Sequence, residues 1–486
     1  MTTETNETTV TRGFKRKMTK AQWIKCIIAS VLYTCWVIWV GNPFLIILLP
    51  VIIDVYYTKF IPWTFWKKSK NAAFRKVMEW VDAIVFALVA VYFINTFFFQ
   101  NYQIPTSSLE KSLLVGDYLF VSKMSYGPRI PNTPLSFPLA QHTLPIVNTK
   151  SYFEWPQWGY KRLKGFGEVE RYNIVVFNFP AGDTVALKMQ NPDFYTLAYY
   201  NGGSQAIRRN PALYGEVVYR PVDRRENYVK RCVGMPGDTL QIINNQVYID
   251  GKELPNPKQM QLNYYVETNG TRFGEKNWEE LGISKDDRGF EDGMGRINVG
   301  GQQISFMEYL GFTPKADGSF NPIYHMPLTQ EALKKLEAMP IVTKIIPEPG
   351  FIAGECYPLG YNERWTRSDY GPIWIPNKGA TIALNPDNIA LYERCIRNYE
   401  DNKLEIKGDK YFINGQEATT YTFKMNYYWM MGDNRDNSAD SRAWGFVPED
   451  HVVGRPLFVW LSIDKDKSLF GGGIRFSRLF MNAKNL

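Results

Sequence analysis

The chain has few of the side chains that bind transition metals or activate a serine. Its 486 residues include only three histidines and five cysteines. The cysteines lie at positions 26, 35, 232, 356 and 395. They form no Cys-x-x-Cys pair and no Cys/His cluster, so neither a zinc site nor a thioredoxin-like motif is supported. His142, His325 and His451 leave few candidates for a Ser-His-Asp triad, and we expect each to be a surface residue. We therefore predict no metal and no cofactor.

The polar two-thirds of the chain also lacks a nucleic-acid-binding pattern. The net charge is +8, but no stripe of Lys and Arg alternates with aromatic residues there. The basic runs lie instead at 13–20 and 59–76, beside apolar segments, as is typical of the cytoplasmic side of a membrane. With 45% hydrophobic residues, the chain has enough apolar surface for a packed core. The sequence predicts a membrane partner and no nucleic acid.

Apolar segments near the N-terminus predict the membrane anchor. Residues 22–58 are mostly apolar but are interrupted by Gly-Asn-Pro at 41–43, which favours a hairpin. Its second arm is short and contains Pro50 and Asp54, so this arm is either tilted or re-entrant. A third span is predicted at 79–100, and the positive-inside rule places everything after residue 100 on the far side of the membrane. We expect no cleaved signal peptide, because the first apolar stretch is too long for one.

After residue 100 the sequence predicts a β-rich domain. Short runs of β-forming residues are separated by Gly, Pro, Asn and Asp: DYLFVSK, NIVVFNFP, TLQIINNQVYIDGK, KLEIKGDKYFINGQ and PLFVWLSID. A helical pattern is visible mainly at 328–339, LTQEALKKLEAM, inside a long interval with few motifs. We therefore predict a mainly β fold, a β-barrel or β-sheet domain with an inserted subdomain, preceded by transmembrane helices.

Two segments of this domain align with each other without gaps. They are LQIINNQVYIDGKEL at 240–254 and LEIKGDKYFINGQEA at 404–418, and each follows an Arg-Cys pair. The pattern fits two independent β-hairpins with Asp-Gly or Asn-Gly turns, and it equally fits an internal duplication. Lys230 in the first copy is replaced by Glu393 in the second. If the repeat is real, only one copy carries the lysine.

Two lysines compete as the partner of a serine nucleophile. Ser108 and Lys111 spell S-x-x-K, the motif of penicillin-recognising enzymes, which requires one helical face. Little helix is predicted here, and the accompanying S-D-N and K-T-G elements are missing. A lysine can act as a base if its amine is neutral, and desolvation can lower its pKa from ~10.4 by as much as about 3 to 5 units. Lys111, beside Glu110 on a polar turn, is expected to stay charged.

Lys230 is the better candidate base. It lies in NYVKRCVGMPGD, on a predicted strand whose alternation places Tyr228 and Cys232 on its own face. A solvated surface lysine is the common alternative.

A third stretch, 430–454, is dense in polar residues and predicts a buried polar loop in which Asp440 and Arg442 can pair, or a structural turn.

Together these three stretches resemble bacterial signal peptidase I, the family of membrane-anchored Ser/Lys proteases that remove signal peptides from exported proteins. IPTSSLEKSLLVGD resembles the family's I-P-S-x-S-M-x-P-T-L-x-x-G-D segment, NYVKRCVGMPGD resembles Y-I-K-R-x-x-G-x-P-G-D, and GDNRDNSADSRAWGFVP resembles its last box almost letter for letter. The resemblance covers roughly 100–254 and 404–464. The chain departs from this family pattern at several positions. Leu109 replaces the usual Met, Lys111 the usual Pro and Ser112 the usual Thr, and Arg-Tyr-Asn at 171–173 replaces the usual Arg-Gly-Asp.

The resemblance assigns a role to each matching position. It implies that Ser108 is the nucleophile, Lys230 the general base, Ser438 a hydrogen-bond partner of that lysine, Thr106 an oxyanion donor with the backbone N–H of Ser108, Asp440 and Arg442 a bracing pair, and Ile104, Leu113 and Val229 the lining of substrate pockets. Lys111 then has no catalytic role. The implied partners are preproteins with signal peptides and the lipid bilayer, and the implied location is the inner membrane, multi-pass, with an extracytoplasmic catalytic domain.

The predicted organisation has eight parts. They are a cytoplasmic basic tail (1–21), a transmembrane hairpin (22–58), a cytoplasmic basic loop (59–78), a transmembrane helix (79–100), a catalytic β-domain in two parts (101–254 and 404–464), an insertion (255–403) and a C-terminal tail (465–486). Two alternatives stay open: a penicillin-recognising Ser/Lys hydrolase that uses Lys111, and a non-catalytic membrane-anchored envelope scaffold. Self-cleaving repressors use a similar Ser/Lys pair but carry a DNA-binding domain instead of membrane spans.

Overall fold

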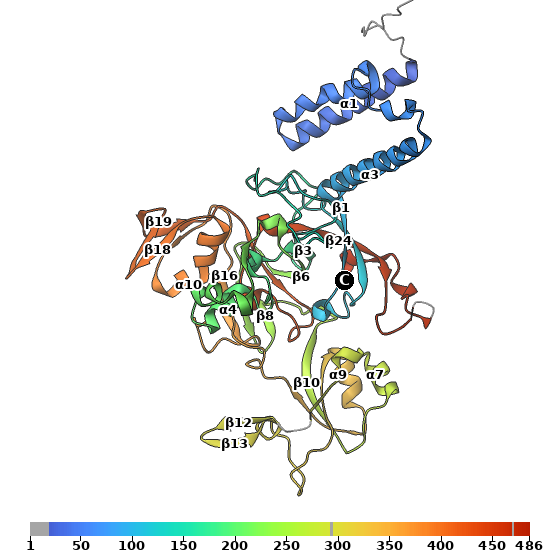
Figure 1. Cartoon of the computed structure of the whole chain (residues 1–486). Helices are drawn as coiled ribbons and strands as arrows, with labels where there is room; N and C mark the ends of the chain where they lie inside the picture. The colour runs from blue at the N-terminus through green and yellow to red at the C-terminus, as the bar shows by residue number, and fades with distance from the viewer. Residues whose placement is uncertain (1–18, 292–294, 469–470) are drawn as a thin grey trace, which may run out of the picture. The chain divides into compact units, whose positions relative to one another are not determined.

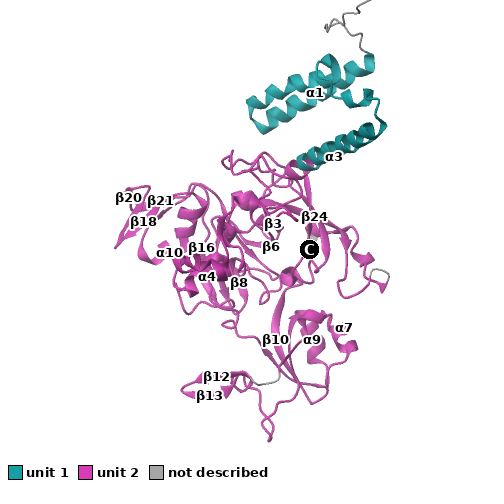
Figure 2. Cartoon of the chain, in the orientation of Figure 1, with its two compact units in different colours: residues 1–93 teal, residues 94–486 magenta. Residues whose placement is uncertain are grey.

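The computed structural model describes residues 19–291, 295–468 and 471–486. The chain forms two compact units, residues 1–93 and 94–486 (Figure 2). Most of the predicted basic tail, up to residue 18, lies outside the described residues. The first unit is helical, and the second contains the predicted β-rich domain.

Two helices of the described chain are long and apolar enough to cross a membrane, α1 (Lys20–Val40) and α3 (Ala72–Phe97). Gly41 ends α1 with a left-handed φ of 65°, as its Gly-Asn-Pro sequence predicts. The following apolar stretch, Pro43–Thr58, is shorter than either helix and consists of 3₁₀, α and π turns (η1, Pro43–Leu48; α2, Leu49–Ile53; η2, Asp54–Thr58). The chain leaves α3 at Phe97 and enters a strand at Phe99, inside the region predicted as membrane helix.

The acidic residue of the short arm is fully engaged in hydrogen bonds. The Asp54 carboxylate accepts from the backbone N–H groups of Phe60 at 2.7 Å and Ile61 at 3.1 Å, and from Trp63 Nε1 at 2.9 Å. These donors follow directly in the chain and fold back over the end of the arm. A carboxylate with this many donors is stable at an otherwise apolar helix end.

The centre of the second unit is an antiparallel sheet of eight strands (Figure 1). Its order is β1 (Phe99–Gln103), β2 (Asp117–Ser122), β24 (Val452–Ser462), β3 (Ile174–Asn178), β6 (Asn227–Gly234), β22 (Tyr427–Met431) and β23 (Val447–Pro448), with β25 (Met481–Asn482) beside β24. Both faces of β3 and β6 are covered. Val175 and Cys232 belong to one buried cluster, and Val176 and Val229 pack into another. The predicted β fold and the predicted strand alternation around Lys230 are confirmed.

The two aligned segments pack on one buried cluster that includes Leu240, Tyr370 and Leu404, and we call the part of the chain around this cluster the second lobe. The first forms β7 (Thr239–Ile243) and β8 (Gln246–Ile249), followed by β9 (Lys252–Glu253), and β7 also pairs with β16 (Tyr370–Trp374). The second forms β18 (Leu404–Lys407), β19 (Lys410–Ile413) and β20 (Gln416–Ala418). Both copies are β-hairpins, but the preceding Arg-Cys lies in strand β6 in one copy and at the end of helix α10 (Pro386–Arg394) in the other. This difference favours two independent hairpins.

The interval predicted as an insertion contains a separately packed part, residues 261–347, which we call the inserted subdomain. Its sheet has the order β11 (Gly289–Glu291), β14 (Ile323–Thr329), β10 (Gln261–Thr268) and β15 (Val342–Pro347), with helices α7 (Glu275–Leu281) and α9 (Gln330–Glu337). Val266, Met326 and Leu336 are fully buried in its own core. Helix α9 confirms the predicted helical pattern. The chain then returns to the second lobe, where β16 pairs with β7.

Other short helices were not predicted. Helices α4 (Phe194–Tyr200), α5 (Ser204–Arg209) and α6 (Pro211–Tyr214) pack on a small core that includes Ile207. They are only seven, six and four residues long, so no clear helical period appears in the sequence. The expectation that helix is found mainly at 328–339 was wrong.

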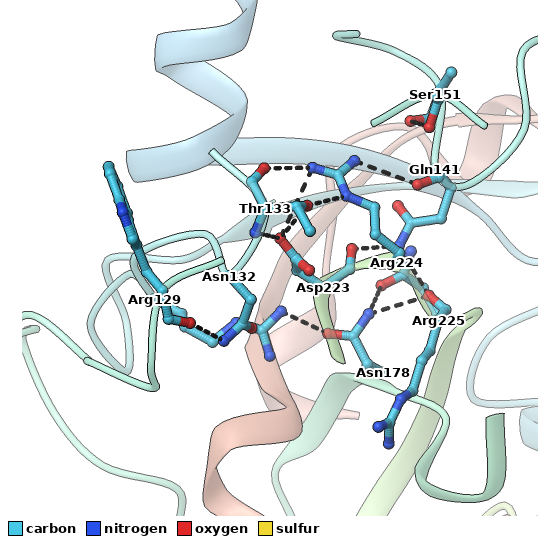
Figure 3. A network of polar contacts seen from close by, with 12 residues as sticks. Arg129, Asn132, Thr133, Gln141, Ser151, Asn178, Asp223, Arg224 and Arg225 are labelled. Atoms are coloured by element: carbon cyan, nitrogen blue, oxygen red, sulfur yellow. Dashed lines mark hydrogen bonds and ion pairs between the residues drawn. The ribbon is translucent and has the colours of Figure 1, made fainter. Parts of the chain in front are cut away.

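The long irregular segment between β2 and β3 is held against the sheet by buried polar groups (Figure 3). Arg129 Nη2 donates to Asn178 Oδ1 at 2.7 Å, on β3. Thr133 donates through its backbone N–H and its hydroxyl to Asp223, both at 2.9 Å, and accepts from Arg224 Nε at 2.6 Å. Because these groups bond to one another across the segment and the sheet, they fix the path of a segment with little secondary structure.

Candidate active site

The structure brings Ser108 and Lys230 together, although they are far apart in the sequence. Ser108 lies in a 3₁₀ turn (η4, Ser107–Leu109) soon after β1, and Lys230 lies in the middle of β6. Lys230 Nζ donates a hydrogen bond to Ser108 Oγ at 2.6 Å. Ser108 is 8% exposed and Lys230 is 5% exposed. A serine hydroxyl and a lysine amine are therefore in direct contact in a buried position.

Burial changes the acid–base behaviour of this lysine. Desolvation lowers the pKa of Lys230 from 10.5 to about 8, against the opposite effect of the Asp440 and Asp433 carboxylates. The Tyr228 ring lies 5.8 Å from the amine, measured to the ring centroid. A lysine with this pKa is partly neutral close to physiological pH, and only the neutral amine can accept a proton.

Lys111 points elsewhere. The turn that carries Ser108 ends at Leu109, and Lys111 itself has a left-handed φ of 72°. Its Nζ donates to the backbone oxygen of Gly282, which follows helix α7 of the inserted subdomain. Ser108 and Lys111 therefore share no helical face, and the geometry that the S-x-x-K interpretation requires is absent.

The predicted pairing of Asp440 and Arg442 is present. Arg442 Nε donates to Asp440 Oδ1 at 2.9 Å and Arg442 Nη2 to Oδ2 at 2.8 Å, with both side chains fully buried. Burial alone would raise the pKa of Asp440, but the adjacent Arg442 lowers it to about 2. The backbone N–H of Gly432 also donates to Asp440, at 3.1 Å. The pair thus closes the loop that contains Ser438.

Ser438 lies in that loop but does not make the expected hydrogen bond. Its side chain is buried, and its Oγ has no hydrogen-bond partner among the residues that the structure describes. The expected bond to Lys230 is therefore absent, because the lysine amine is directed at Ser108 instead. The loop is held at this point through the backbone, since Arg367 Nη1 donates to the Ser438 carbonyl oxygen at 2.6 Å.

Thr106 precedes the turn that contains Ser108. It has extended backbone angles, with φ −130° and ψ 156°, and its side chain makes no capping hydrogen bond to the turn. The residue is exposed. It stands at the N-cap of η4, two residues before Ser108.

The three residues expected to form substrate pockets belong to one apolar cluster. Ile104 and Leu113 are buried in it together with Leu109, and Val229 packs against it from β6. Leu113 has no exposed surface, so it supports this cluster from beneath. Val229 is partly exposed and is the member of the three that can contact a bound chain directly.

Sequence reasoning missed a second buried ion pair beside the site. Arg231 Nε and Nη2 donate to the Asp433 carboxylate at 2.8 Å and 2.6 Å. Ser112 Oγ donates to the same carboxylate at 2.6 Å. Ser112 stands where the family pattern has threonine, and its hydroxyl explains why the smaller residue suffices there. Both partners stand in the motifs quoted above: Asp433 is the first Asp of Gly-Asp-Asn-Arg-Asp, and Arg231 is the Arg that follows Lys230.

One histidine also differs from expectation. His451 is buried, with Nδ1 2.6 Å from Asp450 Oδ1 and Nε2 2.7 Å from Arg225 Nη1. It belongs to the polar contacts that hold the chain around β24 and is not a surface residue. The expectation for His451 was therefore wrong.

Comparison with known proteins finds related sequences. The model of the family described as "Signal peptidase, peptidase S26" matches residues 77–290 and 375–461. Signal peptidase I of Buchnera aphidicola subsp. Acyrthosiphon pisum is 22% identical over 418 residues, covering 85% of this chain and 83% of that protein. Signal peptidase I of Haemophilus influenzae is 23% identical over 418 residues, covering 86% and 79%. Because the family model spans more than half of the sequence, the chain belongs to the signal peptidase family, peptidase S26.

Proposed function

We propose that the protein is a signal peptidase I, a serine endopeptidase that cleaves signal peptides from exported preproteins with Ser108 as nucleophile and Lys230 as general base. The observation that carries this proposal is the 2.6 Å contact between Lys230 Nζ and Ser108 Oγ in a buried position. A serine hydroxyl is a weak nucleophile, and a lysine whose pKa is about 8 can remove its proton. Membership of the family adds independent support.

The reaction begins when neutral Lys230 takes the hydroxyl proton of Ser108 as Oγ attacks the scissile carbonyl carbon. The hydroxyl of Thr106 and the backbone N–H of Ser108 stabilise the oxyanion. The protonated lysine then gives its proton to the leaving amine, and an acyl-enzyme remains on Ser108. A water molecule, deprotonated by Lys230, attacks the acyl carbon, and the proton returns to Ser108 as the acid product leaves.

Ser438 acts on this cycle through its buried hydroxyl. Its Oγ has no partner among the described residues, so it is available to the Lys230 ammonium once Ser108 is acylated and no longer contacts the amine. The Asp440–Arg442 pair supports the same step, because it fixes the loop from which Ser438 projects.

The substrate is a signal peptide with small residues at the first and third positions before the cut. Val229 contacts those side chains in a shallow apolar pocket, and the buried Ile104 and Leu113 support it from beneath. An extended substrate adds as a strand beside the site, so main-chain hydrogen bonds give affinity and the pockets give specificity.

The two long apolar helices anchor the enzyme in the inner membrane, with the second unit on the extracytoplasmic side. Few residues separate the end of α3 at Phe97 from Ser108, so the nucleophile stays close to the membrane surface. Substrates are held in the same bilayer by their apolar helices, and this raises their effective concentration at the site. The alternative, a non-catalytic envelope scaffold, leaves a desolvated lysine next to a serine without a role.

The specificity of cleavage tests the proposal. Full-length protein in detergent is incubated with a membrane-anchored preprotein that has an Ala-x-Ala site, and the new N-terminus is identified by mass spectrometry. A matched preprotein has tryptophan in place of the alanine just before the cut. We expect a single cut after the second alanine and little cleavage of the tryptophan substrate. Absence of cleavage, or equal cleavage of both substrates, would contradict the assignment.

A further inference from the structure

The inserted subdomain is attached to the loop that carries Ser438. We call residues 432–442 the polar loop. The first strand of the subdomain, β10, pairs with it through the backbone: Gln261 N–H donates to the Asp433 carbonyl oxygen and Arg435 N–H to the Gln261 carbonyl oxygen, both at 2.9 Å. Gln261 itself is buried. The subdomain therefore extends the polar loop as a neighbouring strand would.

The next inward-facing residue of β10, Asn263, makes side-chain contacts with the same loop. Its backbone N–H donates to Asp436 Oδ2 at 2.8 Å, and its Oδ1 accepts from Asn437 Nδ2 at 2.9 Å. Its Nδ2 donates to Glu348 Oε2 at 3.2 Å, just beyond β15. Asn263 is only 3% exposed, so leaving its own amide unpaired would be costly.

From Asn437 the hydrogen bonds continue to the serine. Asn437 Nδ2 also donates to Asn434 Oδ1 at 3.2 Å. Asn434 in turn donates through its backbone N–H to the Ser108 carbonyl oxygen at 3.1 Å, and through Nδ2 to the Ser107 carbonyl oxygen at 3.2 Å. One continuous path therefore joins Asn263 of the subdomain to the backbone of Ser108.

We propose that Asn263 is a positioning residue for catalysis and that the inserted subdomain supports the active site through it. The inference rests on the proposed function, because Asn263 acts on the attack by Ser108. The subdomain has its own core, so β10 is a rigid element against which the polar loop is fixed. Asn437 is the bridge, since its amide contacts both Asn263 and Asn434. Loss of the bridge displaces the Ser108 carbonyl and, with it, the nucleophile.

Kinetics of the full-length enzyme in detergent test this proposal. Asn263→Ala is compared with Asn269→Ala, an exposed asparagine of the same subdomain whose Oδ1 accepts only from the Thr271 N–H among the described contacts. We expect Asn263→Ala to lower kcat about 10- to 100-fold with little change in KM, because misplacement of reacting groups slows chemistry more than binding. Asn269→Ala is expected to behave as wild type.

A second variant keeps the test valid if Asn263→Ala folds poorly. Asn437→Ala breaks the same contact from the polar loop. Because both changes interrupt one path, the double variant is expected to lose no more activity than the more affected single variant. Fully additive losses, or wild-type kcat in both single variants, would overturn the proposal.

Hydrogen exchange gives a readout that does not depend on proteolysis. In a Ser108→Ala background, Asn263→Ala is expected to speed amide exchange in peptides that cover 432–438 and 107–109, whereas Asn269→Ala leaves them unchanged. Unchanged exchange in these peptides would refute the support role. If wild-type protein cleaved no preprotein but exchange responded as expected, the proposed function would fail while the structural coupling held.

Discussion

Lys230 Nζ and Ser108 Oγ lie 2.6 Å apart, although 122 positions separate the two residues in the chain. The contact joins the turn after β1 to the middle of β6, and β1 and β6 are not neighbours in the sheet. It exists because the turn after β1 folds over the face of β6 and shields both groups from water. The proposed catalysis depends on this contact and on the burial that lowers the pKa of Lys230.

The pH dependence of activity follows from Lys230. Its pKa is about 8, and only the neutral amine can take the proton of Ser108, so the active fraction rises as the pH increases through 8. We expect kcat/KM to increase about tenfold per pH unit below this value and to level off above it. The measurement is a pH profile of preprotein cleavage by the full-length enzyme. A rate that stays constant between pH 6 and 9, roughly the window around the expected pKa, would argue against a lysine base.

The same lysine is expected to destabilise the fold. In the folded protein its pKa is about 8 instead of 10.5, so below pH 8 a charged amine is buried, at a cost of about 3 kcal/mol at 1.36 kcal/mol per pKa unit. Between these two values the unfolded state binds more protons than the folded state, so the stability of the wild type rises with pH.

Lys230→Met tests this cost. We expect the inactive variant to unfold at a higher temperature than the wild type near neutral pH, with the difference shrinking toward alkaline pH. Lys410→Met, at an exposed position, is the control. A wild type that is more stable than Lys230→Met at neutral pH would contradict the prediction.

Ser438→Ala is expected to separate activity from stability. The Ser438 hydroxyl is buried without a hydrogen-bond partner among the described residues, so its removal relieves a desolvation cost of about 1 kcal/mol or more. We predict unchanged or slightly increased thermal stability together with a clear loss of kcat. A decrease in stability of more than about 1 kcal/mol would indicate that the hydroxyl is hydrogen-bonded in the resting enzyme.

Arg442→Ala is expected to be severely destabilising. It removes the cation that pairs with the buried carboxylate of Asp440, and breaking a buried pair in this way costs about 3 to 5 kcal/mol. The control is Lys410→Ala, which breaks an ion pair with Glu417 whose side chains are 64% and 49% exposed. Such a surface pair contributes less than about 1 kcal/mol. Chemical denaturation in detergent measures both. Equal effects of the two substitutions would show that burial does not control the strength of the Asp440–Arg442 pair.

The sequence predicted the elements whose signal is local. The strands around Lys230 and β24 were found because β-forming residues alternate between turn residues, and the serine and lysine were chosen from short motifs. The hydrogen bond of Ser438 was predicted from resemblance and was wrong, because a family pattern fixes residue types but not the direction in which a buried lysine points. Asp433 and Arg231 were missed as partners because they lie 202 positions apart.

The inserted subdomain shows the same limit. Its helix α9 has a clear amphipathic period and was predicted, but the attachment of Asn263 to the polar loop depends on two segments that meet only in the folded chain. No local pattern distinguishes Asn263 from the exposed asparagines of the subdomain. Contacts between distant segments therefore had to come from the structure.

The most direct test compares cleavage of a membrane-anchored preprotein with an Ala-x-Ala site by four forms of the full-length protein: wild type, Ser108→Ala, Lys230→Ala and Lys111→Ala. We expect product to be lost in the first two variants and retained in Lys111→Ala, whose side chain contacts only the inserted subdomain among the described hydrogen bonds. Loss of product in Lys111→Ala together with an active Lys230→Ala would contradict the Ser108/Lys230 assignment and favour the S-x-x-K alternative.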